Sequence, residues 1–297
     1  MKNLITDKFI IEKDEDGYGY DVVVVTSKWS EEIKEYIKDN KIKGLYLNDA
    51  RGWEGDNIEF LKELPELEYF KIIDYSIEDV SPVHYLKNVR ILQIYTYCNT
   101  ELNFLEFPYL EDCGFEWRTR AKTIFKCKGL KKLFINCYKG KDSKVFSNLK
   151  NLEELKLYTC PLPDIEGFGE LRKLRHLDIA YFRKLTSLKG IEKLTEMKIL
   201  ELNTCRKIRS IDEIRYLKKL EELSLINMGE IESLKPIEGL ENLRAVIFYD
   251  DTNIVDGDLT PLTRLKNLED VGFMDRKHYH PRKEYFDYLN ERRKRKK

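Results

Sequence analysis

A leucine frame repeats along most of the chain and constrains its fold more than any other feature. In its clearest copy, Leu152-x-x-Leu155-x-Leu157-x-x-Cys160, leucines occupy positions 1, 4 and 6 of a repeat. Ten further copies begin at these residues: Ile42, Leu67, Val89, Leu110, Leu130, Leu174, Met197, Leu220, Leu243 and Leu268. From Leu67 onward the starts lie 20 to 25 residues apart. A repeat of this length predicts a solenoid of short, similar coils.

The spacing within one repeat predicts the structure of one coil. Positions 4 and 6 alternate with their neighbours as the residues of a short strand do. Downstream, apolar residues recur every three positions, for example at Ile208, Ile211, Ile214 and Leu217, which suits short 3₁₀ turns. Stacked coils share one core, so we predict an α/β solenoid with a parallel sheet on its concave side and 3₁₀ or irregular segments on its convex side.

This frame resembles that of leucine-rich repeat proteins, in particular the short repeats, about 22 residues long, of bacterial internalin-like proteins. The resemblance covers about residues 42–275 and implies a horseshoe that serves as a scaffold for a partner. The ninth position, Asn or Cys in the family, is different in several copies: Tyr75, Tyr97, Tyr138, Phe182 and Met228. Those coils lack a side-chain amide ladder, so we expect irregular curvature, most of all between residues 89 and 152.

Segments at both ends are expected to cap the solenoid. We predict an N-terminal cap over residues 1–40, a solenoid of about eleven repeats over residues 41–275, and a C-terminal cap with a basic tail over residues 276–297. The N-terminal cap is predicted to contain strands at 9–12 and 20–26, followed by a helix with Ser30 at its N-cap. The C-terminal cap contains a short helix at 284–290.

Composition limits the class of protein. The chain has 53 Lys and Arg against 53 Asp and Glu, so its net charge is zero, and 42% of its residues are hydrophobic. This supports a sizeable core and removes the simplest charge argument for nucleic-acid or membrane binding. Six separated cysteines without a CxxC pair predict buried free thiols. Without a recognisable export signal or apolar span, the chain is expected to be cytoplasmic.

No pattern in the sequence matches a known catalytic set. The chain lacks a phosphate loop and the HExxH and GxSxG motifs, so we predict a protein that is not an enzyme and has no cofactor, metal or small-molecule substrate. His278 and His280 have no third ligand at useful spacing and are interpreted as surface residues. His176 and Asp178, expected on one strand face, are interpreted as a surface pair rather than a catalytic base. Cys137 is expected to be a small residue on the same face.

Positions 3, 5, 7 and 8 of each repeat are expected to point away from the core, onto the concave side. Aromatic and acidic residues gather at these positions, among them Tyr46, Tyr69 and Asp112, with eleven carboxylates against only Lys71, Lys132 and Lys156. Such a face attracts basic proteins and disfavours nucleic acid. The residues predicted to bind the partner are Tyr95, Trp117, Phe134, Glu154, Tyr158, Asp178, Tyr181, Glu201, Tyr249 and Asp250. Aromatic stacking along the strands, or a merely solvated acidic face, are the alternatives.

The leading hypothesis is therefore a non-catalytic module that binds a protein partner, which the acidic face suggests to be basic. A sharper version is an immunity or inhibitor protein that masks a basic toxin or enzyme. The alternative is binding of nucleic acid or an anionic membrane through the basic tail at residues 292–297. An enzyme hidden in the caps is disfavoured, because residues 1–40 contain no plausible nucleophile and base.

Overall fold

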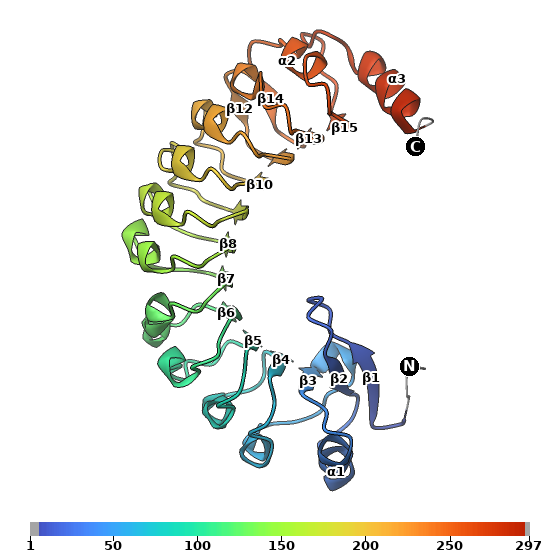
Figure 1. Ribbon diagram of the computed structural model, residues 1–297, viewed down its shortest axis with the longest axis vertical. Helices are drawn as coiled ribbons and strands as arrows, with labels where there is room; N and C mark the ends of the chain where they lie inside the picture. The colour runs from blue at the N-terminus through green and yellow to red at the C-terminus, as the bar shows by residue number, and fades with distance from the viewer. Residues whose placement is uncertain (1–5, 295–297) are drawn as a thin grey trace. The chain divides into compact units, whose positions relative to one another are not determined.

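The structure, a computed structural model, describes residues 6–294, without the side chains of Thr119 and of residues 292–294. The described chain divides into two compact units, called here unit 1 (up to Ile135) and unit 2 (from Asn136). Short parallel strands line the inner side of each unit and 3₁₀ segments its outer side (Figure 1). The predicted leucine-rich repeat solenoid is confirmed in both units.

Unit 1 opens with an antiparallel hairpin of β1 (Phe9–Lys13) and β2 (Asp21–Val25), followed by helix α1 (Glu31–Asp39). Strand β2 then pairs in parallel with the first repeat strand, and the others follow in chain order. These strands are β3 (Gly44–Asn48), β4 (Tyr69–Ile73), β5 (Ile91–Tyr95), β6 (Asp112–Glu116) and β7 (Lys132–Asn136), which ends at the unit boundary. The outer side holds η1 (Asp49–Arg51), η2 (Glu59–Glu63), η3 (Ser81–Tyr85), η4 (Phe104–Glu106) and η5 (Thr119–Lys126).

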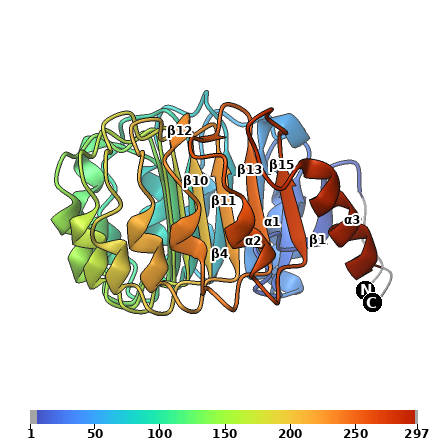
Figure 2. The same ribbon diagram turned by 90° about the horizontal axis from the view of Figure 1, so that it is seen from above.

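Unit 2 continues the pattern with six parallel strands in chain order (Figure 2). They are β8 (Glu154–Tyr158), β9 (His176–Ala180), β10 (Ile199–Asn203), β11 (Glu222–Ile226), β13 (Ala245–Tyr249) and β15 (Asp270–Phe273). Outer segments are η6 (Ser143–Asn148), η7 (Glu166–Glu170), η8 (Ile191–Lys193), η9 (Asp212–Tyr216), η10 (Lys235–Ile237) and α2 (Thr260–Thr263). A second parallel pair, β12 (Glu230–Ile231) with β14 (Asn253–Ile254), was not predicted from the sequence.

The repeat frame places its leucines in the core, as the sequence predicts. Leu177 aligns with Leu200 on the next strand, and both are fully buried. The three-residue step also forms the expected 3₁₀ bonds: the Leu194 amide donates to the Ile191 carbonyl (2.8 Å), and the Leu217 amide to the Ile214 carbonyl (2.9 Å). Burying each leucine contributes about 1.5–3 kcal/mol, so neighbouring coils stabilise one another.

A left-handed turn follows the strands of unit 2 at position 8. Six residues there have φ between 53° and 60°: Cys137, Thr159, Tyr181, Thr204, Asn227 and Asp250. The amide at this position donates to the carbonyl of position 7 in the next coil, as from Thr159 to Ala180 (2.9 Å). After five of these turns the ninth side chain points inward, so Tyr138, Cys160, Phe182, Cys205 and Met228 are all buried, whereas Asp251 after Asp250 is exposed. In those five coils the ninth position fills the core.

Unit 1 closes its coils differently. No described residue at position 8 of β4, β5 or β6 has a left-handed φ, and Asp74 and Thr96, which occupy it after β4 and β5, are buried. The ninth residues Tyr75 and Tyr97 lie instead on the surface, with ring centroids 4.4 Å apart. The ninth residues that depart from the family pattern therefore differ between the units. Tyr75 and Tyr97 of unit 1 follow turns without a left-handed residue and are exposed, whereas Tyr138, Phe182 and Met228 of unit 2 pack in the core.

The elements expected at both ends are present. Ser30 precedes α1 as its N-cap residue, although its side chain makes no capping hydrogen bond. Helix α3 (Lys283–Lys294) packs Phe286 against Phe273 of β15, with ring centroids 5.6 Å apart. None of the helices in the described part of the chain has the length and apolar character required to cross a bilayer.

All six cysteines are free thiols, as predicted. The expected burial holds for Cys113, Cys160 and Cys205, but the other three, Cys98, Cys127 and Cys137, are only half-buried. Cys137 lies in a left-handed turn at the end of β7, rather than on the strand face as expected.

Candidate functional site

The strand register of unit 2 brings residues from separate repeats into columns on the strand face. Position 5 forms one column, Lys156, Asp178, Glu201, Ser224, Ile247 and Gly272. Position 3 forms another, which contains Glu154, His176, Ile199, Glu222, Ala245 and Asp270. Because adjacent strands lie about 4.8 Å apart, side chains in one column can contact each other.

An acidic cluster forms where β8, β9 and β10 meet. It consists of Glu154, Lys156, Tyr158, His176, Asp178 and Glu201. The Tyr158 hydroxyl donates to Asp178 Oδ2 (2.5 Å), and Lys156 Nζ lies 2.9 Å from Glu154 Oε1. His176 Nε2 lies 2.8 Å from Glu201 Oε2. The sequence predicts that His176 pairs with Asp178 on its own strand. The carboxylate that His176 contacts is instead Glu201 on the next strand, because the position 3 and position 5 columns lie side by side on the sheet.

The surroundings of Asp178 in the acidic cluster raise the pKa of its carboxyl. Its side chain is buried, and burial raises the pKa of this carboxyl, with a smaller increase from the nearby Glu201 and an opposing decrease from the Tyr158 hydrogen bond. The hydrogen bond to His176 instead lowers the pKa of Glu201. The fold therefore holds three carboxyl groups together and raises the pKa of one of them, Asp178. Such an arrangement is typical of functional sites.

The rest of the strand face of unit 2 is open to solvent. Tyr249 is 37% exposed and Met274 is 52% exposed. Tyr249 lies over Gly272 of the next strand, since a Cβ added there would come within 2.7 Å of the Tyr249 hydroxyl. Glu222 and Asp270, at position 3 of β11 and β15, are exposed as well. Aromatic rings and carboxylates thus share one accessible surface.

The strand face of unit 1 is covered by the chain itself. The loop at residues 14–20, between β1 and β2, lies on the strand side of this unit (Figure 1). The Tyr18 hydroxyl donates to Asp112 Oδ2 and the Tyr69 hydroxyl to Asp16 Oδ2, both at 2.8 Å. Lys71 Nζ lies 2.6 Å from Glu15 Oε2. We call this loop the hairpin tip.

Several residues expected on an accessible face are therefore buried. Tyr46 is 5% exposed and Tyr69 is 1% exposed, within a cluster that includes Val22 and Val24 of the hairpin. The expected exposure of these tyrosines is wrong, because the β1–β2 hairpin packs apolar side chains over them and Asp16 of the hairpin tip accepts the Tyr69 hydroxyl. Asp112 is likewise buried.

The ten predicted partner-binding residues fall into separate groups. Four of them, Glu154, Tyr158, Asp178 and Glu201, meet in the acidic cluster, and Tyr249 lies farther along the same face. Tyr181 and Asp250 occupy left-handed turns at the edge of the sheet rather than its face. These turns could not be foreseen from an alternating strand pattern, because the alternation ends at position 7.

The remaining three predicted residues lie in unit 1. Tyr95 and Phe134 contact each other, with ring centroids 5.8 Å apart, and the Tyr95 hydroxyl donates to Gln93 (2.6 Å). The Trp117 ring lies 6.2 Å from Phe115 and 6.0 Å from Phe125, both buried. Trp117, which follows the last residue of β6, is half-buried and packs at the border of the core.

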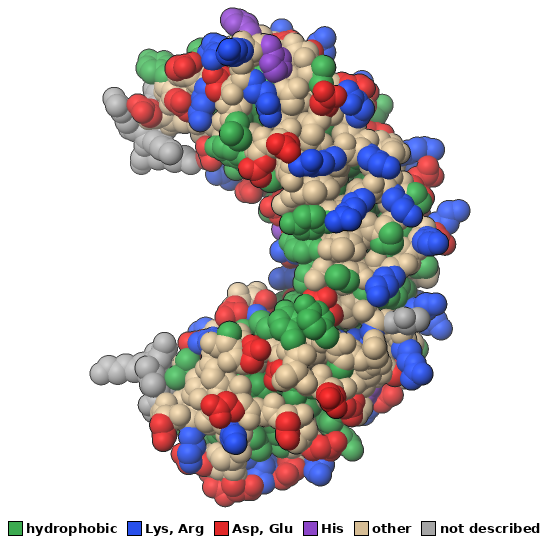
Figure 3. All heavy atoms as spheres, turned by 180° about the vertical axis from the view of Figure 1, so that it is seen from behind, with side chains coloured by type: hydrophobic (Ala, Val, Ile, Leu, Met, Phe, Trp, Pro, Cys, Tyr) green, Lys and Arg blue, Asp and Glu red, His purple; other side chains and the backbone are tan. Residues whose placement is uncertain are grey.

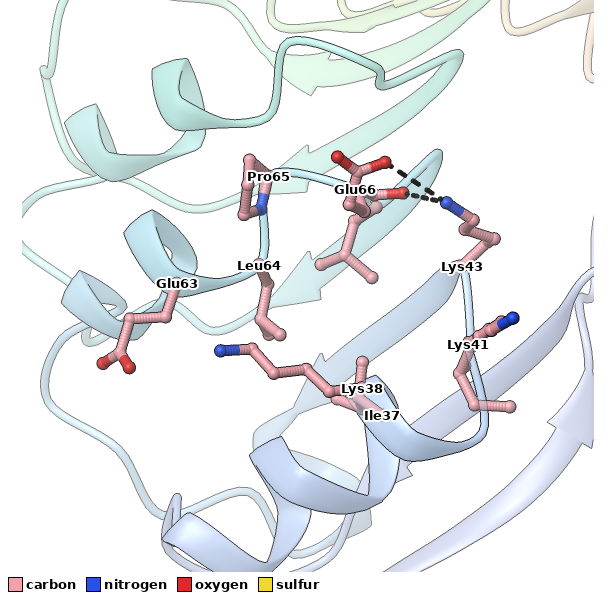
Figure 4. Close-up of a pocket in the computed structure, with 10 residues that line it drawn as sticks. Ile37, Lys38, Lys41, Lys43, Glu63, Leu64, Pro65 and Glu66 are labelled. Atoms are coloured by element: carbon pink, nitrogen blue, oxygen red, sulfur yellow. Dashed lines mark hydrogen bonds and ion pairs between the residues drawn. The ribbon is translucent and has the colours of Figure 1, made fainter.

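A hollow of about 220 Å³ lies between the end of α1 and residues 64–67 (Figure 4), where Lys43 Nζ lies 3.5 Å from Glu66 Oε2. Within the described residues, no three His, Cys, Asp or Glu side chains form a group able to hold a metal ion. His278 Nε2 contacts the Ile254 carbonyl (3.0 Å). The basic-tail prediction falls on side chains outside the described residues.

Comparisons with solved structures support the same fold. An internalin from Listeria monocytogenes is 18% identical, with a TM-score of 0.52 over 86% of this chain and 87% of that chain. A leucine-rich repeat protein from Leptospira interrogans is 15% identical, with a TM-score of 0.56 over 86% and 77%. A TDR receptor is 17% identical, with a TM-score of 0.63 over 84% of this chain and 46% of its own. No protein-family model and no curated protein matches the chain.

Proposed function

We propose that the strand face of unit 2 binds a protein partner that carries a basic patch. The observation behind this proposal is the acidic cluster together with the exposed Tyr249 on one side of a rigid sheet. Aromatic side chains supply contact area in protein interfaces. Fixed carboxylates attract a cationic surface and select against an anionic one.

The contrast with unit 1 supports this choice of face. In unit 1 the hairpin tip already bonds to Asp112, Tyr69 and Lys71 of the strand face. In unit 2, Tyr249 and Met274 remain substantially exposed. Apolar side chains gathered on an accessible surface are typical of interaction sites.

The raised pKa of Asp178 also supports a binding role. A partner cation close to this carboxylate would favour its charged form and offset the cost of its burial. The finer version of the proposal is a partner that is a basic toxin or enzyme, which the chain would mask as an immunity or inhibitor protein. The finer version rests on the charge of the face alone.

Affinity capture from the source cell tests the proposal. The bait would be the full chain or its Glu154→Lys/Glu201→Lys variant, with bound proteins identified by mass spectrometry. The matched control is Glu232→Lys/Glu241→Lys, which makes the same charge change at exposed residues outside the acidic cluster. We expect a basic protein to be captured by the wild-type chain and the control and to be lost, by at least about tenfold, with the first variant.

Thermal unfolding of both variants checks that each is folded. Capture that is equal in all three chains, or lost equally in both variants, would contradict the proposed face. A captured protein that is acidic would contradict the proposed partner chemistry.

A further inference from the structure

A hollow of about 400 Å³ opens in unit 2 where the coils leave β7, β8 and β9. Its lining includes Tyr138, Lys139, Pro161, Tyr181, Arg183 and Lys184. We call it the basic hollow. It lies at the end of the strands, beyond position 7, and is therefore distinct from the acidic cluster. The inference below is independent of the proposed function.

Positive charge in the basic hollow is not neutralised by the chain. Lys139, Arg183 and Lys184 are exposed, and within the described residues none of them forms an ion pair. Many other cations of unit 2 pair across coils, as Lys150 does with Glu170 (3.0 Å). The nearby Asp142 carboxylate accepts the Lys144 amide at the start of η6 (2.8 Å). Lysine and arginine side chains gather over unit 2 on the face seen in Figure 3.

The spacing of these cations follows from the repeat. Lys139, Pro161 and Arg183 occupy the tenth position of three successive coils. With strands about 4.8 Å apart, Lys139 and Arg183 are roughly 10 Å apart, with a neutral proline between them. Two cations at this separation, with Lys184 next to one of them, fit an extended or multiply charged anion better than a single small ion.

The walls of the hollow are aromatic and apolar. Tyr138 and Cys160 are buried beneath it. Tyr181 is 47% exposed, because its left-handed backbone (φ 60°) turns Phe182 into the core and leaves the tyrosine ring outside. An exposed aromatic ring beside cations is the combination on which a nucleic-acid base stacks while its phosphates are bound.

We propose that the basic hollow binds a nucleoside phosphate, with the base against Tyr181 and the phosphates on Lys139, Arg183 and Lys184. The same chemistry is offered by a free nucleotide and by a nucleotide within a single strand of RNA. Arginine binds phosphate in a planar, two-point geometry, so Arg183 is expected to be the strongest anchor.

Calorimetric titration of the full chain tests the proposal with four probes in the presence of EDTA: ATP, a short single-stranded adenosine oligonucleotide, adenosine and inorganic phosphate. We expect ATP or the oligonucleotide to bind at least about tenfold more tightly than adenosine or phosphate alone, and the affinity to fall as salt rises. Tighter binding of the oligonucleotide would identify the source as RNA, and tighter binding of ATP as a free nucleotide.

Variants at the hollow locate the site. Tyr181→Ala and Arg183→Ala should each weaken binding by at least about tenfold, whereas Tyr181→Phe should retain it, because stacking needs only the ring. The matched controls are Tyr216→Ala and Arg215→Ala on η9, where Tyr216 is 57% exposed. Binding of neither ATP nor the oligonucleotide would overturn the proposal. So would equal effects of the two pairs of variants, or phosphate binding as tightly as ATP.

Discussion

Units 1 and 2 share one repeat but close their coils in different ways. In unit 2 the eighth residue takes a left-handed conformation and sends the ninth side chain into the core, as Tyr181 does for Phe182. After β4 and β5 of unit 1 the eighth side chain itself enters, as Thr96 does, and the ninth residue Tyr97 stays outside. The backbone conformation of one residue therefore decides which of two neighbouring side chains is buried.

The second difference concerns the strand faces. In unit 1 the hairpin tip covers the strand face through bonds that join residues far apart in sequence, such as Tyr18 with Asp112 and Tyr69 with Asp16. Unit 2 leaves tyrosine and carboxylate groups open to solvent. The comparison suggests that the same scaffold serves stability in one unit and recognition in the other.

The ninth position gives the largest expected difference between the units. Phe182→Ala should destabilise unit 2 by about 3–5 kcal/mol, because it empties a fully buried site. Tyr97→Ala should change stability by less than about 0.5 kcal/mol, because its ring is 69% exposed. Hydrogen exchange resolved by segment would measure each unit separately. Equal losses of stability from the two substitutions would contradict the proposed difference between the turns of the two units.

The eighth position offers a matched pair of threonines. Thr96 is buried, and Arg118 donates to its hydroxyl and carbonyl (both 3.1 Å). Thr96→Asn should therefore cost about 1–3 kcal/mol. Thr159 is exposed at φ 54°, which a β-branched residue adopts at a cost and asparagine tolerates. Thr159→Asn should stabilise by up to about 1 kcal/mol in urea unfolding. Changes of the same sign at both sites would contradict the assigned turns.

The hairpin tip should respond to loss of one hydroxyl. Tyr69→Phe removes the bond to Asp16 and should cost about 1 kcal/mol. It should also increase hydrogen exchange in residues 14–20. Tyr249→Phe, the control on the exposed face of unit 2, should leave stability within about 0.5 kcal/mol. An unchanged exchange rate in the hairpin tip would show that the bond does not hold it.

Asp178→Asn should have a small stabilising effect. The folded chain raises the pKa of Asp178, so the stability that depends on this group falls as pH rises through that pKa and stays lower above it. Asparagine keeps an acceptor for Tyr158 but no charge, so the variant should be more stable at pH 7 by less than about 1 kcal/mol. Below the ordinary carboxyl range the gain should vanish. A loss of stability at pH 7 would contradict this sign.

The sequence predicts local periodic features well, and the structure shows why other features escape it. The leucine frame and the three-residue step define the core, because burial requires those positions whatever the rest of the chain does. The alternation of a strand cannot reveal that it stops at position 7, which is why Tyr181 and Asp250 lie in turns rather than on the strand face. The cover over Tyr46 and Tyr69 depends on contacts between distant segments, for which the sequence carries no periodic signal.

Hydroxyl-radical footprinting of tyrosine and methionine side chains, with and without a lysine-rich peptide, tests the central claim most directly. We expect Tyr46 and Tyr69 to resist oxidation in both samples. Tyr249 and Met274 should be oxidised in the free chain and become protected when the peptide is added. Oxidation of Tyr46 and Tyr69 as fast as that of Tyr249, or a peptide that protects no residue of unit 2, would contradict the account.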